Sequence, residues 1–388
     1  MLRKIVASLL LFAMTGMLPV CAFAKTAIGL WVECQGSENS LGSKSSIDAM
    51  LADSRSMGVT DLFIQVHRGN RSWCKSAYSD QSPYNQFLAK EGFDPTAYII
   101  KNAHQSGIKV HLWMNTFRIL KNTDAPIIQA LGTKILTRDG KKTLILDYPA
   151  EDLPDGSYWL DPGDLEVQEY LVKLVQDIMS NYPEADGVHL DFIRYPYRIP
   201  FYPGSQWAGG KSFGYGVDSV SRFQAATGLN PFEMELTRDN AQKWDDWKRE
   251  QVNAFVRKIY AVTVPAKKQL SIAGICWADR AYLSAYQDWR GWLKEGIVDF
   301  VATMNYSIDT KFAYYLSREA IVSREKKQVM VGLGAYLLSD DPDSLARQMD
   351  DAVNLGTDGI IIFSYDSIKP LNRMKSMIAE KARSYNRQ

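Results

Sequence analysis

The chain has no excess of charge of either sign. Its 388 residues include 45 Lys and Arg against 44 Asp and Glu, which gives a formal net charge of +1. A balanced chain is not drawn to nucleic acid or to an anionic surface by its overall charge. Beyond the first residues, no run is long and apolar enough to span a bilayer. We therefore expect a protein that binds no nucleic acid and spans no membrane, and we expect it to act as a monomer.

Sequence motifs of several enzyme classes are also missing. No G-x-G-x-x-G follows the first predicted strand and no P-loop occurs, which disfavours nucleotide binding. No G-x-S-x-G marks a serine nucleophile on a predicted strand-to-helix turn. The histidines lack H-x-H and H-E-x-x-H spacing, so a metal-dependent hydrolase or deacetylase is kept only as an alternative. We expect neither a metal nor another cofactor.

The first 24 residues predict a signal peptide. Arg3 and Lys4 precede an apolar run over 5–20, and the Ala-Phe-Ala of 22–24 has the small-x-small form of a cleavage site. We expect cleavage near Ala24 and export to the periplasm or to the extracellular space. The remainder, 25–388, is predicted to form one domain.

Cysteine is scarce. Cys34 and Cys74 each follow a predicted strand, and the two strands should be neighbours, so we expect a disulfide between them with Cys276 left over. The alternative is three buried thiols, since free cysteine packs as a small hydrophobic residue. Cys21 raises a lipoprotein alternative, which Val20 disfavours because a lipobox has a small residue there.

What the sequence does contain is a repeated order of helix, glycine, short apolar strand and polar loop. This order is typical of βα units and a parallel sheet. Strands are predicted at 27–33, 61–66, 108–114, 187–191, 269–275, 298–304, 329–333 and 359–363. Helices are predicted at 45–57, 95–105, 164–181, 239–262, 281–294, 312–323, 341–355 and 370–384. We predict an α/β fold, a (β/α)8 TIM barrel with long loops after strands 3 and 4; an open doubly wound sheet is the alternative.

The fourth predicted strand delivers a carboxylate to one end of this barrel. Side chains alternate along a strand, so Gly187, His189 and Asp191 share one face. Asp191 stands at the C-terminal end of the strand, where TIM-barrel enzymes carry their chemistry. The residue therefore becomes the first candidate for a catalytic role.

Polar and aromatic side chains gather at the other predicted strand ends. Burying polar groups without need is costly, so a polar layer here favours a ligand site. The chain also has 10 Trp and 20 Tyr, which suits the stacking of sugar rings, although core filling explains many of them. We expect the substrate to contact Gln65, His67, Arg68, Trp113, Asn115, His189, Arg194, Tyr195, Trp277, Asn305, Tyr306, Tyr336, Tyr365 and Asp366.

Paired carboxylates account for these features most simply. Glycoside cleavage uses two acids, ~5–5.5 Å apart in retaining enzymes and ~6.5–9.5 Å apart in inverting ones. We predict Asp191 as nucleophile or base and Glu33, which has the inward phase on the first strand, as its partner. Asp279, just beyond the fifth strand, is a reserve catalytic acid, and Asp366 comes third.

Each of the two acids also has a purely structural interpretation. Asp191 could cap the following helix or pair with Arg194, although such a pair would also keep a catalytic carboxylate ionised. Glu33 could form an ion pair with Arg68 or Arg71 of the loop after the second strand.

Four stretches of the sequence carry a resemblance to a known family. They are Trp31-Val32-Glu33 with Gly36, the run 61–66 followed by Arg68-Gly69, the run 186–191 with Arg194-Tyr195-Pro196, and Gln287-Asp288-Trp289. They are similar to the exported bacterial family 10-like glycosyl hydrolases, earlier a domain of unknown function. The resemblance covers nearly all of 25–388. It implies a TIM barrel and glycoside hydrolysis, and some relatives act on the glycan strands of peptidoglycan.

One position departs from the family pattern. Many members carry two consecutive acids in the fourth-strand motif, and here Phe192 occupies the second place. Asp191 is then the matching carboxylate, and the second catalytic group is open. We predict an exported glycoside hydrolase that cleaves a polysaccharide, such as an envelope or peptidoglycan glycan. The alternative is a non-catalytic glycan-binding protein on a degenerate barrel.

Overall fold

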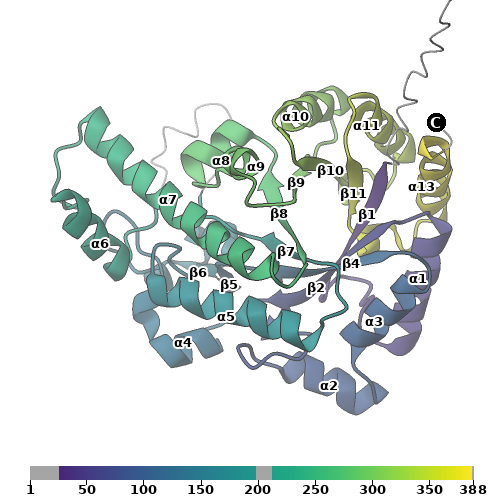
Figure 1. Cartoon of the computed structure of the whole chain (residues 1–388), viewed down its shortest axis with the longest axis horizontal. Helices are drawn as coiled ribbons and strands as arrows, with labels where there is room; N and C mark the ends of the chain where they lie inside the picture. Colours follow the sequence, from purple (N-terminus) through teal and green to yellow (C-terminus); the bar gives the residue numbers. More distant parts are fainter. Residues whose placement is uncertain (1–25, 198–211, 387–388) are drawn as a thin grey trace, which may run out of the picture.

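The computed structural model describes residues 26–197 and 212–386 (Figure 1). Its centre is a closed ring of eight parallel strands, which confirms the predicted (β/α)8 barrel. Because β1 pairs with both β2 and β11, the sheet has no open edge there. In ring order the strands are β1 (Ala27–Val32), β2 (Asp61–Arg68), β4 (Lys109–Asn115), β7 (Gly187–Asp191), β8 (Gln269–Ile275), β9 (Phe300–Met304), β10 (Gln328–Gly334) and β11 (Gly359–Phe363).

Helices cover the outside of this ring (Figure 1). They are α1 (Lys44–Ser56), α2 (Ser82–Glu91), α3 (Pro95–His104), α4 (Pro126–Leu131), α5 (Leu165–Asn181), α6 (Val217–Thr227), α7 (Arg238–Thr263), α8 (Ala278–Ser284), α9 (Trp289–Glu295), α10 (Thr310–Val322), α11 (Pro342–Asn354), α12 (Tyr365–Ile368) and α13 (Asn372–Tyr385). Short β3 (Arg71–Ser72) pairs antiparallel with β2, and β5 (Arg118–Leu120) pairs with β6 (Tyr158–Trp159) between β4 and α5. The segment that follows β4 therefore carries structure of its own beside the barrel.

Capping side chains explain where several helices begin. The side chain of Asp164 accepts hydrogen bonds from the backbone N–H groups of Glu166 and Val167 at the start of α5. Asp94 and Asp309 cap α3 and α10 in the same way. An N-terminal side-chain oxygen satisfies backbone donors that have no partner inside the helix.

The single helix predicted over 281–294 is wrong, because the chain breaks there into α8 and α9. Tyr286 has a φ of 55°, in the left-handed region that no helix can continue through. The next residue, Gln287, turns inward and accepts a hydrogen bond from the Ile275 N–H at 2.9 Å. Asp288 then caps α9. Sequence periodicity continued across the break and concealed it.

The barrel separates two buried clusters. The larger lies between the strands and the helices, and the smaller, rich in aromatic residues, fills the inside of the ring. The inner cluster consists of Trp31, Phe63, Trp113, Phe300, Ala302, Met330 and Ile361. Buried histidines complete this interior: His111 pairs with Asp61 at 3.1 Å, and the Phe63 ring stacks on it with 4.7 Å between centroids. The aromatic cluster forms the floor beneath the strand ends.

The cysteines do not form the expected disulfide. Cys34, Cys74 and Cys276 are all free. The Cys34 thiol donates to Gln65 Oε1 at 3.2 Å, whereas the Cys74 thiol faces the Val66 carbonyl at 3.8 Å, so each has a partner of its own.

The predicted signal peptide, 1–24, lies outside the described residues, as does Cys21 within it. Within 26–197 and 212–386, no helix is both long and apolar enough to cross a membrane.

Candidate active site

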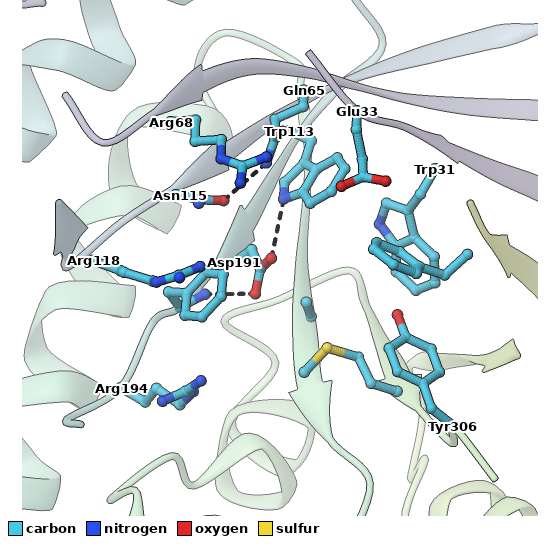
Figure 2. A pocket seen from close by; sticks show the side chains of 14 residues that line it. Trp31, Glu33, Gln65, Arg68, Trp113, Asn115, Arg118, Asp191, Arg194 and Tyr306 are labelled. Atoms are coloured by element: carbon cyan, nitrogen blue, oxygen red, sulfur yellow. Dashed lines mark hydrogen bonds between the residues drawn. The ribbon is translucent and has the colours of Figure 1, made fainter. Parts of the chain in front are cut away.

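A pocket of about 210 Å³ opens at the C-terminal ends of the barrel strands (Figure 2). Most of its walls come from strand ends that lie far apart in the sequence but meet around the ring. The lining residues are Trp31, Glu33, Gln65, Arg68, Trp113, Asn115, Arg118, Asp191, Phe192, Arg194, Ala273, Met304, Tyr306 and Phe363. In TIM-barrel enzymes this end of the barrel carries the chemistry, so the pocket is the candidate active site.

Asp191 is the last residue of β7 and only 8% exposed. Its carboxylate accepts hydrogen bonds from the Phe192 N–H at 2.7 Å and from Trp113 Nε1 at 3.3 Å. Burial raises the pKa of Asp191, while these two donors and the guanidinium groups of Arg194 and Arg118 oppose that rise. The environment therefore excludes water but supplies donors and positive charge that stabilise the ionised form.

The strand-end turn exposes this carboxylate to the pocket. Phe192 has a φ of 52°, a backbone conformation that bulky residues rarely adopt. Its ring lies against two guanidinium groups, with the Cζ of Arg118 4.7 Å and that of Arg194 5.0 Å from the ring centroid. Backbone strain of this kind persists where surrounding packing holds it and is frequent at functional sites.

Glu33 follows β1 and enters the pocket from another side (Figure 2). Its Oε2 accepts a hydrogen bond from Ser364 Oγ at 2.9 Å. Burial raises the pKa of Glu33, the negative charge of Asp366 raises it further, and Ser364 and Arg68 act in the opposite direction. A carboxyl group with an acidic neighbour retains its proton to higher pH than a free one.

The ion pairs that would have given the two acids a purely structural role are not formed between the described residues. Within the described ranges, Glu33 forms no ion pair with Arg68 or Arg71, and Arg71 instead pairs with Asp80 at 3.4 Å. Arg194 likewise pairs with the carboxylate of Asp155, at 3.2 Å, rather than directly with Asp191. Both acids are left available to the pocket.

Two side-chain amides link neighbouring strands beside the acids. Gln65 of β2 donates from Nε2 to Asn115 Oδ1 of β4 at 3.2 Å. Arg118, three residues beyond Asn115, is fixed by Ser157 Oγ, which accepts from its Nε at 2.8 Å. These bonds hold polar groups in place at the mouth of the barrel.

The opposite side of the pocket is largely apolar. Tyr306 and Phe363 stack with 5.3 Å between ring centroids, and Trp31 lies 5.9 Å from Phe363. Tyr336, which is 46% exposed, packs edge-on against Tyr306 at 5.9 Å. In Figure 2 Trp31 and Tyr306 lie across the pocket from Asp191, while Glu33 lies beside Trp31.

Eight of the predicted site residues line this pocket, and the others do not. Those in the lining are Glu33, Gln65, Arg68, Trp113, Asn115, Asp191, Arg194 and Tyr306. Tyr336 packs against Tyr306 at the edge of the pocket. Asp366 is close enough to Glu33 to act on its pKa, and it accepts from the Glu38 N–H at 2.9 Å.

Two predicted contact residues are structural histidines. His67 donates from Nδ1 to the Asn115 carbonyl at 3.0 Å, and burial lowers its pKa to about 4. His189 accepts from Trp31 Nε1 at 3.1 Å and lies 2.9 Å from Ser271 Oγ, and burial lowers its pKa as well. Both rings are neutral parts of the barrel interior.

Three further residues that were predicted to contact the substrate have side chains that point away from the pocket. Asn305 donates to Ser317 Oγ of α10 at 3.1 Å. The Tyr365 hydroxyl donates to Asp53 of α1 at 3.0 Å, because α12 starts at this residue and directs it toward the outer helices. Tyr195 is fully buried with its ring edge-on to that of Tyr286.

Asp279 and Trp277 border a different hollow. Asp279 lies in the first turn of α8, its side chain is 81% exposed, and it pairs with Arg290 at 2.7 Å. Trp277 is covered by the guanidinium group of Arg280, with Cζ 3.8 Å from the ring centroid. The structure does not bring the reserve acid to the candidate active site.

Sequence reasoning missed several lining residues. Trp31 and Phe363 have the inward phase of their strands, as Glu33 has, and that alternation was the available signal. Arg118 lies beyond β4 in the inserted segment, where no periodicity marks it. In the described part of the chain, no group of three His, Cys, Asp or Glu side chains is arranged to hold a metal ion.

A barrel with carboxylates and aromatic rings at its mouth fits a recognised class. The chain belongs to the glycosyl hydrolase-like 10 family, whose sequence model matches residues 28–337. Its relatives include the glycosyl hydrolase YngK of Bacillus subtilis, which is 26% identical in an alignment of 343 residues that covers 77% of this chain and 58% of YngK. The glycosyl hydrolase DigH of Escherichia coli K12 is 26% identical in an alignment of 275 residues that covers 64% of this chain and 55% of DigH. The chain thus spans little more than half the length of these curated relatives.

Solved structures show the same fold. The glycoside hydrolase domain of PgaB (BpsB) from Bordetella bronchiseptica matches with a TM-score of 0.66 at 12% identity, over 91% of this chain and 98% of that domain. The catalytic domain of beta-amylase from Paenibacillus polymyxa matches with a TM-score of 0.60 at 12% identity, over 94% of this chain and 99% of that domain. Both neighbours are TIM-barrel glycosidases.

Proposed function

We propose that this protein is an exported glycoside hydrolase that cleaves a polysaccharide with Asp191 and Glu33 as its paired carboxylates. The observation that carries this proposal is that a buried acid at the end of β7 and a half-buried acid directly after β1 line one pocket at the strand ends. Hydrolysis of a glycosidic bond needs an acid on the leaving oxygen and a carboxylate on the other side of the sugar. The predicted signal peptide supports an envelope glycan as substrate.

The two acids have surroundings suited to different roles. Asp191 accepts from two N–H donors and lies near two guanidinium groups. These oppose the rise that burial causes in its pKa and suit a nucleophile or base. Glu33 is half-buried near Asp366, and burial and that negative charge both raise its pKa, as suits a general acid. Burial raises the pKa of both acids, so the roles are assigned from their different charged neighbours.

The walls of the pocket suit a sugar. Trp31, Tyr306 and Phe363 offer aromatic surface on which the C–H face of a ring can pack. Gln65 and Asn115 offer amide groups to hydroxyls. A pocket with mostly apolar walls and a few placed polar groups is the usual form of a small-molecule site.

The test is the release of new reducing ends from denuded peptidoglycan strands and from a panel of neutral and acidic polysaccharides. We expect Asp191→Asn and Glu33→Gln each to lower the rate at least ~100-fold, a typical effect of losing a general acid or base. Glu380→Gln, on the exposed face of α13, is the matched control and should keep full activity.

Unchanged turnover in Asp191→Asn would remove this residue from the mechanism. Strands that bind the wild-type protein and yield no new ends would instead support the glycan-binding alternative, which the phenylalanine at position 192 motivates.

A further inference from the structure

Three arginines lie along one side of the candidate active site, and we call Arg68, Arg118 and Arg194 the arginine wall. Figure 2 shows them on the side of Asp191, across the pocket from Trp31 and Tyr306. They come from β2, from β5 and from the turn after β7, so three separate segments converge on this wall.

The wall carries more positive charge than its neighbours neutralise. Among the residues that the structure describes, its only ion pair joins Arg194 to Asp155, at 3.2 Å. Arg118 donates to the Ser157 hydroxyl at 2.8 Å and to the Asp155 carbonyl at 2.9 Å, both neutral acceptors. Arg118 is partly buried, and this burial lowers its pKa.

Each of the other two arginines has one buried donor atom without a partner among the described residues. Arg68 Nε and Arg194 Nη1 are both buried without a hydrogen-bond acceptor in the described part of the protein. A guanidinium group has five N–H donors in a rigid fork, and leaving buried donors unused is unfavourable. Arg194 is itself 93% buried, at 7% exposure, so bulk water does not replace the missing acceptor.

Asp191 neutralises only part of the positive charge of the arginine wall. One carboxylate lies near Arg118 and Arg194, and it already accepts from the Phe192 N–H and from Trp113 Nε1. Glu33, the other acid of the pocket, holds its proton more tightly than usual and lies near Arg68 without pairing to it. The wall retains spare charge-assisted donors that face the space where a sugar would lie.

We propose that the arginine wall binds an anionic oxygen group carried by the glycan, a carboxylate or a phosphate on the sugar next to the cleaved bond. Arginine forks match such groups with paired N–H donors. The proposal rests on the proposed function for the position of the sugar, and it deepens that function by naming an acidic glycan as the substrate class. Carboxylate and phosphate share this chemistry, and the experiment separates them.

The test measures binding and does not depend on cleavage. Isothermal titration of the wild-type protein uses sodium glucuronate, glucose 6-phosphate and glucose as probes. We expect at least one of the two anions to bind ~10-fold or more tightly than glucose, in line with a charge-assisted hydrogen bond. Preference for glucuronate assigns the carboxylate, and preference for glucose 6-phosphate assigns the phosphate.

Variants of the arginine wall then show which residues cause the preference for an anionic probe. Arg68→Gln is the first choice because the Arg68 side chain donates no hydrogen bond to any described residue, so the fold loses no side-chain hydrogen bond. We expect it to lose most of the anion preference, and Arg118→Gln to do the same while Arg118→Lys keeps part of it. Arg318→Gln, exposed on α10, should bind all probes as the wild type does.

Equal affinity for the three probes, or no measurable binding of either anion, would overturn the proposal, and so would a preference that survives in both glutamine variants. If the protein prefers an anion but releases no reducing ends from any glycan, the proposed anion site is supported and the proposed hydrolase activity is contradicted. If it cleaves neutral strands and shows no anion preference, the hydrolase activity is supported and the anion site is contradicted. The two proposals therefore fail separately.

Discussion

The indole Nε1 of Trp113 donates a hydrogen bond to Asp191 Oδ2 at 3.3 Å. This bond joins the end of β4 to the end of β7. In the parallel pairing of these two strands, the register partner of Trp113 is His189, and that of Asp191 is Asn115. The same indole ring forms part of the inner aromatic cluster. The orientation of the candidate catalytic carboxylate is therefore set by the packing of the barrel interior.

Replacing this indole with a phenyl ring tests that relationship. Trp113→Phe keeps an aromatic ring but removes a donor to the ionised carboxylate, so the pKa of Asp191 should rise. We expect kcat/KM on a cleaved glycan to fall roughly tenfold and its acidic limb to move to higher pH. Trp247→Phe is the control, since the Trp247 Nε1 has no partner among the described residues. A lower rate with an unmoved pH profile would indicate that Trp113 acts through packing alone.

The alkaline limb of activity should respond to Asp366. Burial is the main cause of the raised pKa of Glu33, and the negative charge of Asp366 adds to it. Asp366→Asn removes that charge but keeps an oxygen for the Glu38 N–H, so Glu33 should lose its proton at lower pH. We expect the alkaline limb of kcat/KM to shift to lower pH. Asp239→Asn, exposed at the start of α7, is the control, and a limb that stays in place would remove Glu33 as the general acid.

Stability should depend on the ionisation of Asp191. Because burial raises its pKa, the folded protein holds this proton more tightly than the unfolded chain does. Its stabilising contribution is then complete below the unfolded pKa and is lost as the pH rises through the folded pKa. We expect Asp191→Asn to raise the Tm at pH 7 by about 2 °C and to lose that advantage near pH 4. Calorimetry at both pH values decides this, and a constant difference would contradict it.

A second buried charge gives the opposite pH trend. Lys248 is 1% exposed, its ammonium group lies 4.0 Å from the centroid of the Tyr286 ring, and burial lowers its pKa to about 8. Its unfavourable contribution is present below that pH and disappears as the pH rises toward the pKa of an unfolded lysine. The Tm of Lys248→Met relative to wild type should therefore be higher at pH 7 than at pH 9.5. A difference that grows with pH would show that the ion pair with Asp245 dominates.

The fold was predictable because its signals are local and repeated. Each barrel strand is a short apolar run after a glycine or a turn, and all eight runs were found. Helices α2 and α6 were missed because each buries only two residues, too few to give a clear apolar period. The break at Tyr286 depends on one backbone angle and on the side chain of Gln287, which no pattern announces.

The site residues were predictable only where the alternation of side chains along a strand determines which face they occupy. Alternation placed Asp191 and Glu33 on inward faces, and both line the pocket. Two or more residues past a strand, the alternation of side chains no longer gives their direction: Asp279 is carried outward by α8 and Tyr365 by α12. Arg118 comes from an insertion, and only tertiary packing brings it to the arginine wall.

The bond between Ser364 and Glu33 spans 331 positions of the chain. The candidate acid comes directly after β1, and its hydroxyl partner comes directly after β11. Because β1 pairs with β11, this contact forms only when these two strands meet and the ring closes. A barrel that is open at this seam would hold the candidate acid without its partner, so ring closure itself assembles this part of the pocket.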